Sequence, residues 1–245
     1  MSSKSPPRFA LTGDVDWASD YCIDAYVDHA ASHGIVPTLF VTHLSAAIGR
    51  LAAQGRVHLG IHPNFLPGSS HGTTTEEVLD FVFDLVPHPV ASRSHCFADN
   101  SAVAESLARR GVTIDSNICC HLQEGLPILR HWNGVARLPV FFEDDTHWAQ
   151  DGNDWNFARY QQAFASPGLK ILNFHPFLWA LNTPDAGFYA EHRGHIPTLT
   201  ADQAASLRHK GAGSATFLDD IIGWVKDAGG AFVSLPELYE MGRAA

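Results

Sequence analysis

The chain has few cysteines and no long uninterrupted run of apolar residues. Its 4 cysteines, among 245 residues, show no Cys-x-x-Cys spacing and are too few to cross-link a chain of this length. Nowhere do about eighteen uncharged apolar residues follow one another, and the first residues lack the apolar segment of a secretory signal. We therefore expect reduced thiols, no integral membrane segment and a cytoplasmic protein.

Basic residues are also scarce. Lysine and arginine together number 16, against 26 aspartates and glutamates, which gives a formal net charge of −10 with histidine neutral. The chain lacks the basic stripe that neutralises phosphates, so we expect no nucleic-acid partner. Hydrophobic residues make up 45% and charged residues 17%, an ordinary globular composition. The length fits a single domain of the size of a (β/α) barrel.

Segments typical of strands alternate with segments typical of helices. The predicted strand segments are 8–16, 35–42, 57–65 (a strand with its exit loop), 91–99 (a strand end), 111–117, 134–145 and 169–181. The predicted helices are 18–34, 45–55, 74–86, 101–111 and 214–230. This alternation predicts an α/β fold with a parallel, barrel-like sheet over residues 1–245, preceded by a flexible tail at 1–7. The polar stretches 146–160 and 182–214 break the rhythm and are predicted to be long loops over one end of the barrel.

Polar side chains gather where the predicted strands end, and histidine, with 15 copies, is abundant. In parallel α/β folds the carboxyl ends of the strands lie together and carry the chemistry. Several strand ends that present acids, imidazoles and an arginine therefore indicate a functional site. The residues at these ends are Asp14 and Asp16, His62 and Asn64, Arg93 and His95, Asp144 and Asp145, and His175.

Each of these residues also has a purely structural interpretation. Asp16 alone could be a helix N-cap, but a cap does not account for Asp14 as well. Two acids at positions i and i+2 of an extended segment can face the same way, so that one holds a metal ion and the other acts as a base. Arg93 could orient an aspartate or pair with any nearby acid, and His95 could be a metal ligand. His175 alone is weak evidence.

The order of these motifs resembles the polysaccharide deacetylases of carbohydrate esterase family 4, and within that family the branch found with bacterial lipopolysaccharide and O-antigen biosynthesis. The closer similarity lies in the strings GIHPNFLPGS, RSHCFADN, FFEDD and NFHPFLWALNT, and the resemblance runs from about residue 8 to 240. It implies a distorted or incomplete (β/α)7-8 barrel. It also implies a metal-dependent hydrolase that removes an N-acetyl group from an amino sugar in a polysaccharide or lipopolysaccharide precursor.

The resemblance also implies roles for individual residues. Asp14 matches the catalytic base, Arg93 the arginine that orients this base, and His175 the general acid. Asp16 and His62 match two metal ligands. The implied cofactor is a divalent ion, most simply Zn²⁺, with Co²⁺ or Ni²⁺ as alternatives.

The sequence departs from the family pattern at the third ligand. The second histidine of the His-x-x-x-His motif would fall at position 66, which is Leu66. His95 is the first candidate to replace it, because it lies beside Arg93 at a neighbouring strand end. His71, in the loop after the third predicted strand, is the second candidate.

Further residues are expected to contact the acetylated amino-sugar substrate: Asn64, Asp144, Asp145 and Trp179. Trp179 belongs to a group of aromatic residues, with Trp148, Trp155 and Phe177, that could stack on sugar faces or pack together as a lid. Two other functions stay open from the sequence. The same barrel and metal could hydrolyse another C–N bond, such as a cyclic amide or ureide, or the absence of His at position 66 could mark a non-catalytic carbohydrate-binding protein.

Overall fold

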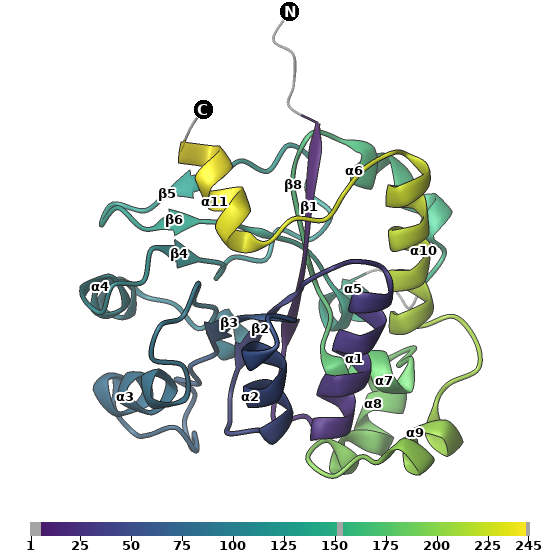
Figure 1. The fold of residues 1–245 in the computed structure, drawn as a ribbon, viewed down its shortest axis with the longest axis horizontal. Helices are drawn as coiled ribbons and strands as arrows, with labels where there is room; N and C mark the ends of the chain where they lie inside the picture. The colour runs from purple at the N-terminus through teal and green to yellow at the C-terminus, as the bar shows by residue number, and fades with distance from the viewer. Residues whose placement is uncertain (1–5, 151–153, 244–245) are drawn as a thin grey trace, which may run out of the picture.

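A parallel sheet forms the centre of the computed structural model, which describes residues 6–150 and 154–243. The five strands of this sheet have the order β3-β2-β1-β8-β7, and all neighbours run parallel (Figure 1). Most of the expected tail at 1–7 falls outside the described residues, and the first strand already begins at Pro7. The strands are β1 (Pro7–Asp14), β2 (Thr38–Val41), β3 (His58–Ile61), β7 (Val140–Glu143) and β8 (Gly168–Asn173).

Shorter extended segments continue the sheet from β3 round to β7. Ser92 forms bridges with both Ile61 and Asp115, and Cys119 forms a bridge with Val140. A small sheet of order β4-β6-β5 extends this side of the ring. Its strands are β4 (Ile114–Asp115), β5 (Leu129–Arg130) and β6 (Ala136–Arg137). The ring of parallel segments is therefore closed through isolated bridges, which confirms the expected α/β fold in the form of a distorted barrel.

Helices surround this sheet, and their starts follow from the sequence. The Ser19 hydroxyl caps α1, and Thr74 with Glu77 forms a capping box at α3. The helices before β7 are α1 (Asp20–Ser32), α2 (Ala46–Ala53), α3 (Thr75–Leu85), η1 (His95–Phe97) and α4 (Ser101–Arg109). Between β7 and β8 lie α5 (Asp144–Gln150), η2 (Phe157–Arg159) and α6 (Gln161–Ala165). After β8 come α7 (Pro176–Leu181), α8 (Ala186–His192), η3 (Arg193–His195), α9 (Ala201–Leu207), α10 (Ser214–Asp227) and α11 (Leu235–Arg243).

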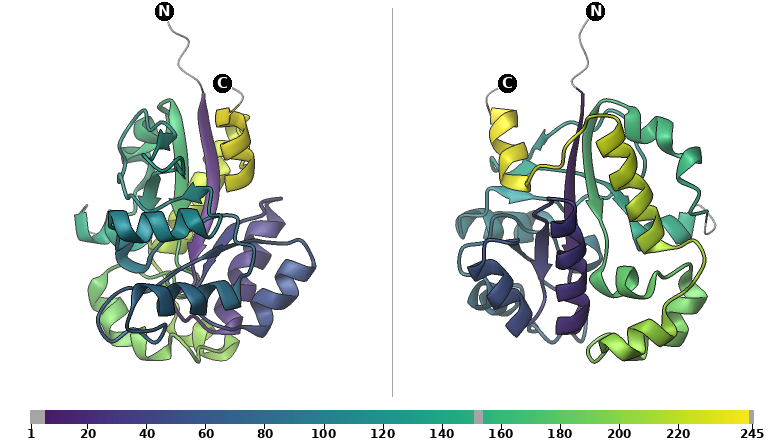
Figure 2. Two further views of the ribbon diagram at one scale, coloured as in Figure 1. Left: turned by 90° about the vertical axis from the view of Figure 1, so that its left-hand side faces the viewer. Right: turned by 45° about the vertical axis from the view of Figure 1, so that its right-hand side comes forward.

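The two ends of the barrel differ in what covers them. The start of β1 and α11 lie at one end, whereas α8 and α9 lie at the other, and the views in Figure 2 agree on this arrangement. Residues 9–14 of β1 are all buried, because helices cover the outside of the sheet and side chains fill the ring. No helix in the described ranges is both long and apolar enough to cross a membrane.

Two expectations about local structure are wrong. Residues 151–153 of the stretch 146–160 lie outside the described residues, but α5 and η2 occupy parts of the rest. The stretch 182–214 is not a continuous loop, because Asp185 and Thr200 cap α8 and α9. The predicted strand 169–181 ends already at Asn173. The rest of this segment is largely helical, because Pro176 begins α7. The end of the barrel where the strands finish is thus covered by short helices.

Candidate active site

Three side chains that can act as metal ligands meet near the carboxyl ends of β1 and β3. Oδ1 of Asp16 lies 3.2 Å from Nε2 of His62 and 3.2 Å from Nδ1 of His95. Ligands at tetrahedral positions around zinc, roughly 2.0–2.1 Å from the ion, are about 3.3 Å apart. The carboxylate oxygen and the two imidazole nitrogens all lie within 4.8 Å of one another, which suits a divalent ion that keeps a position for water or substrate. We call Asp16, His62 and His95 the candidate metal site.

The local backbone positions each of these three residues. Asp16 and Trp17 follow β1 with φ of 44° and 58°, in the left-handed region. His62 is buried directly after β3, and the backbone N–H of His95 donates to the Pro63 carbonyl. Burial by itself would raise the pKa of Asp16, but hydrogen bonds from His62 and His95 hold that pKa well below its usual range. Asp16 is therefore an ionised acceptor, which is the form that binds cations.

Asp14 lies beside this site in a buried hydrogen-bonded network around Arg93. Nη1 of Arg93 donates to Oδ1 of Asp14 at 2.8 Å and to the side-chain oxygen of Asn173 at 2.7 Å. Nδ2 of Asn173 donates to Oδ2 of Asp14 at 3.0 Å. Arg93 also donates to the backbone and side-chain oxygens of Ser116. Both oxygens of Asp14 are thus held in place, and Oδ2 lies 3.9 Å from Nε2 of His62.

His175 approaches the same site from the end of β8. Its Nε2 lies 3.6 Å from Oδ2 of Asp16, and its Nδ1 lies 2.7 Å from Oδ1 of the fully buried Asp144. Asp144 also accepts from the His175 backbone N–H and the Ser214 hydroxyl. Burial alone would lower the pKa of His175, but the charge of Asp144 and the hydrogen bond to it raise that pKa well above its ordinary value. His175 is therefore a cation that can donate a proton.

A cavity of about 370 Å³ opens over these groups. We call it the polar chamber. Its lining consists of Asp14, Asp16, His62, His95, Cys96, Phe97, Cys119, His121, Glu143, Asp145, Thr146, Gln150 and His175. No lysine or arginine is among these lining residues of the described chain, so the chamber presents carboxylates, imidazoles and neutral hydrogen-bonding groups.

Two of its acids have raised pKa values. Burial, reinforced by the charge of Asp145, raises the pKa of Glu143 to about 8. Burial likewise raises the pKa of Asp145. Glu143 accepts hydrogen bonds from Asn173 at 2.8 Å and from the Thr146 hydroxyl at 2.7 Å. Asn173 thus joins Glu143 to the network that holds Asp14.

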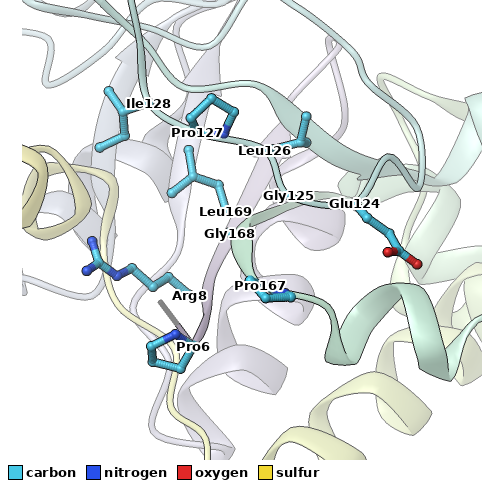
Figure 3. A pocket seen from close by; sticks show the side chains of 10 residues that line it. All are labelled: Pro6, Arg8, Glu124, Gly125, Leu126, Pro127, Ile128, Pro167, Gly168 and Leu169. Atoms are coloured by element: carbon cyan, nitrogen blue, oxygen red, sulfur yellow. The ribbon is translucent and has the colours of Figure 1, made fainter. Parts of the chain in front are cut away.

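A wider cavity, of about 530 Å³, lies at the opposite end of the barrel. The starts of β1 and β8 and the loop 124–128 form its walls, and its lining contains prolines, two leucines and an isoleucine in addition to Arg8 and Glu124 (Figure 3). Among its lining residues in the described chain there is no histidine, cysteine or aspartate. Of these two cavities, the polar chamber therefore holds the side chains able to bind a metal ion and transfer protons, in agreement with the rule for parallel α/β folds.

Comparison with known proteins agrees with this geometry. The family model described as WbmS-like polysaccharide deacetylase matches residues 11–193, which include every member of the candidate metal site as well as Asp14, Arg93 and His175. The chain belongs to the WbmS-like polysaccharide deacetylase family. The resemblance and the class of enzyme expected from the sequence are thereby confirmed.

Solved structures of this kind share the fold. A chain from Bordetella bronchiseptica, assigned as a polysaccharide deacetylase involved in O-antigen biosynthesis, is 29% identical, with a TM-score of 0.79 over 89% of this chain and 90% of that one. A polysaccharide deacetylase structure from Mycobacterium smegmatis is 18% identical, with a TM-score of 0.52 over 96% of this chain and 95% of that one, and shows likeness of fold alone. The curated proteins include no match to the chain.

In this deacetylase, His95 and not His71 lies in the candidate metal site. Nδ1 of His71 accepts from the backbone N–H of Asn64 at 3.1 Å, and its ring stacks on Phe81 at 4.6 Å. Leu66 is partly exposed, and its backbone N–H donates to the Asn64 side chain. The turn after β3 therefore directs position 66 and His71 to other contacts, while η1 brings His95 to Asp16.

Of the expected substrate contacts, Asp145 alone lines the polar chamber. Asn64 uses its side chain to hold the turn after β3. Asp144 is fully buried behind His175, where it partners the ring instead of facing the chamber. Trp179 packs against Tyr26 and His29 of α1, because the helical periodicity of α7 turns it away from the strand ends. These three placements correct the expectation of direct sugar contacts.

Several residues of the site were not predicted. Asn173 and Glu143 lie at the ends of β8 and β7, and Ser116 supports Arg93 from the segment after β4. Asn173 precedes His175 by two positions on an extended segment, so alternation along the strand places both near the same end. That spacing was the available signal. For Ser116 and Ser214 the sequence offers no pattern that separates them from ordinary polar residues.

Proposed function

We propose that this deacetylase is a metal-dependent hydrolase that removes an N-acetyl group from an amino sugar. The observation that carries the proposal is the position of Asp14 beside the candidate metal site, with His175 also within reach of Asp16. A base, a set of metal ligands and a proton donor around one chamber are the parts that amide hydrolysis needs. Zn²⁺ is the proposed ion, and Co²⁺ or Ni²⁺ would suit the same ligands.

Asp16, His62 and His95 would hold the ion. When bound there, a divalent ion makes water a usable nucleophile near neutral pH and polarises the amide carbonyl. Asp14 takes the proton of the attacking water, and Arg93 with Asn173 keeps its carboxylate in one orientation. His175, held as a cation by Asp144, donates a proton to the departing amine. The C–N bond breaks, and the products are acetate and the free amino sugar.

The polar chamber supports a sugar as the substrate. Glu143, Asp145, Thr146 and Gln150 offer hydrogen-bonding groups for sugar hydroxyls next to the catalytic residues. The Bordetella relative is assigned to O-antigen biosynthesis. We therefore propose an acetylated amino sugar in a polysaccharide or lipopolysaccharide precursor, and a cytoplasmic place of action.

The test is release of a primary amine from acetamido sugars. Protein stripped of metal and then reloaded with Zn²⁺, Co²⁺ or Ni²⁺ is incubated with N-acetylglucosamine, N-acetylgalactosamine and their oligosaccharides, and the amine is measured by fluorescence labelling. Metal-dependent release that is absent in Asp14→Asn supports the proposal. Turnover of cyclic amides or ureides without any release from acetamido sugars would contradict it, as would sugar binding without turnover in any reloaded sample.

A further inference from the structure

A smaller cavity, of about 220 Å³, adjoins the polar chamber. The two share part of their lining, namely Asp16, His95, Cys96, Asp145 and His175. They therefore meet at the candidate metal site and at the proposed proton donor. An amide placed for attack at this junction would have both chambers within reach.

The smaller cavity differs from the polar chamber in chemistry. The rest of its lining is uncharged and mostly apolar: Val15, Trp148, Phe177, Leu178, Tyr189 and Ile196. We call it the apolar chamber. Trp148 of α5 and Tyr189 of α8 face each other with ring centroids 5.9 Å apart. Phe177 and Leu178 belong to the first turn of α7, directly after His175, so one helix start supplies both the proton donor and an apolar wall.

We propose that the apolar chamber binds the acyl part of the substrate and accepts acyl groups longer than acetyl. This inference rests on the proposed amide hydrolysis and adds its acyl specificity. The polar chamber offers partners for sugar hydroxyls at Glu143, Thr146 and Gln150. A sugar ring in the apolar chamber would lose hydrogen bonds to water against apolar walls, whereas an alkyl chain loses none. The chemistry of the two chambers therefore places the sugar half of the amide in the polar chamber and the acyl half in the apolar chamber.

The size of the apolar chamber is the reason to expect a preference for acyl chains longer than acetyl. A cavity of about 150 Å³ with leucine, isoleucine and phenylalanine walls accommodates a benzene ring. At about 220 Å³, which includes the polar junction shared with the polar chamber, the cavity is larger than the methyl group of an acetyl requires. An acetyl group would leave most of these walls against water, and each additional methylene removes apolar surface from water and strengthens binding.

Binding of the carboxylate products tests this inference without relying on turnover. Acetate, butanoate and hexanoate are titrated into the Zn²⁺-loaded protein by isothermal titration calorimetry. We expect hexanoate to bind at least about tenfold more tightly than acetate. Ile196→Phe, which fills the chamber, should reduce this ratio to less than about threefold. Val36→Phe, at an exposed position away from both chambers, is the matched control and should keep the ratio. No gain from acetate to hexanoate, including no binding at all, would overturn the inference.

A second measurement separates failure of this inference from failure of the proposed function. Glucosamine carrying an N-acetyl, N-butanoyl or N-hexanoyl group is offered to the Zn²⁺-loaded protein, and amine release is measured. A higher kcat/KM for butanoyl than for acetyl supports the inference. Turnover of the acetyl compound alone overturns it and leaves the proposed function standing. No turnover of any compound, together with tighter binding of hexanoate, contradicts the proposed function while supporting the acyl chamber.

Discussion

Arg93 and Asp14 form a buried ion pair at the centre of the strand ends. The distance from Nη1 to Oδ1 is 2.8 Å, and the arginine side chain is fully buried. The guanidinium also lies 4.2 Å from the centre of the Phe40 ring. A buried arginine fixes the direction of the aspartate carboxylate, as is needed for a carboxylate that accepts a proton from water. The pair therefore has two expected effects: it stabilises the barrel, and it orients the carboxylate proposed as the base.

Replacing the base separates its role from that of the metal ligands. Asp14→Asn is expected to lower kcat for an acetamido sugar by about 10² to 10⁴, because asparagine keeps the shape but cannot take the proton. The metal content should stay at the wild-type level, because Asp14 lies outside the candidate metal site. Steady-state kinetics and inductively coupled plasma mass spectrometry on the same sample check both statements. Loss of metal in Asp14→Asn as complete as in His62→Ala would refute this division of roles.

The buried pair should be strongly coupled in stability. Arg93→Met is expected to lower the free energy of unfolding by about 3–5 kcal/mol, because it leaves the Asp14 carboxylate buried without its partner. In the double variant with Asp14→Asn the loss should be clearly smaller than the sum of the two single losses. Urea denaturation of the four proteins measures this coupling.

An exposed ion pair provides the matched control. Arg56 lies 2.7 Å from Asp28, and the aspartate side chain is 66% exposed. Arg56→Met should cost less than about 1 kcal/mol. Equal losses in the free energy of unfolding for Arg56→Met and Arg93→Met would contradict the larger contribution to stability that is expected of the buried pair.

Lys170 gives a prediction for the pH dependence of stability. Its side chain is buried in β8, where Nζ donates to the Ser166 hydroxyl and lies 4.3 Å from the centre of the Phe141 ring. Burial lowers the pKa of Lys170 to about 8. The unfolded chain, with an ordinary lysine pKa, therefore binds more protons than the folded chain between these two pKa values. Folding stability from this group should consequently rise as the pH increases from 8 towards 10.5.

The variant Lys170→Met isolates this contribution. The free energy of unfolding of the wild type, minus that of the variant, should increase by about 3 kcal/mol between pH ~7 and pH ~10.5. Urea denaturation at both pH values gives the two differences. Parallel pH profiles for the two proteins would show that Lys170 titrates normally in the folded state.

Much of the fold and of the site could be predicted, because parallel strands impose order. Alternating strands and helices predict that all carboxyl ends meet, so Asp14, Asp16, His62, Arg93 and His175 were expected together before any coordinates. In the structure Asp14, Asp16, His62 and His175 line one chamber, and Arg93 donates a hydrogen bond to Asp14. His95 was favoured over His71 because of its neighbour Arg93, and it is His95 that contacts Asp16.

Other positions depend on turns that the sequence does not mark clearly. Trp179 was expected near the sugar, but Pro176 begins a helix, and the change from strand to helical periodicity turns the indole towards α1. Asp144 and Asp145 are adjacent, and only the start of α5 at Asp144 decides that one faces His175 and the other the chamber. The spacing of Asn173 from His175 places it near the strand end, but its hydrogen bonds to Asp14 and Glu143 become evident only when β1 and β7 lie on either side of β8.

The central claim is that Asp16, His62 and His95 hold one metal ion. Inductively coupled plasma mass spectrometry tests it on wild-type protein purified without chelator, beside His95→Ala and the matched His71→Ala. The account predicts close to one divalent ion per chain in the wild type and in His71→Ala, and loss of that ion in His95→Ala. Full metal content in His95→Ala, or no metal in the wild type even after addition of Zn²⁺, Co²⁺ or Ni²⁺, would contradict it.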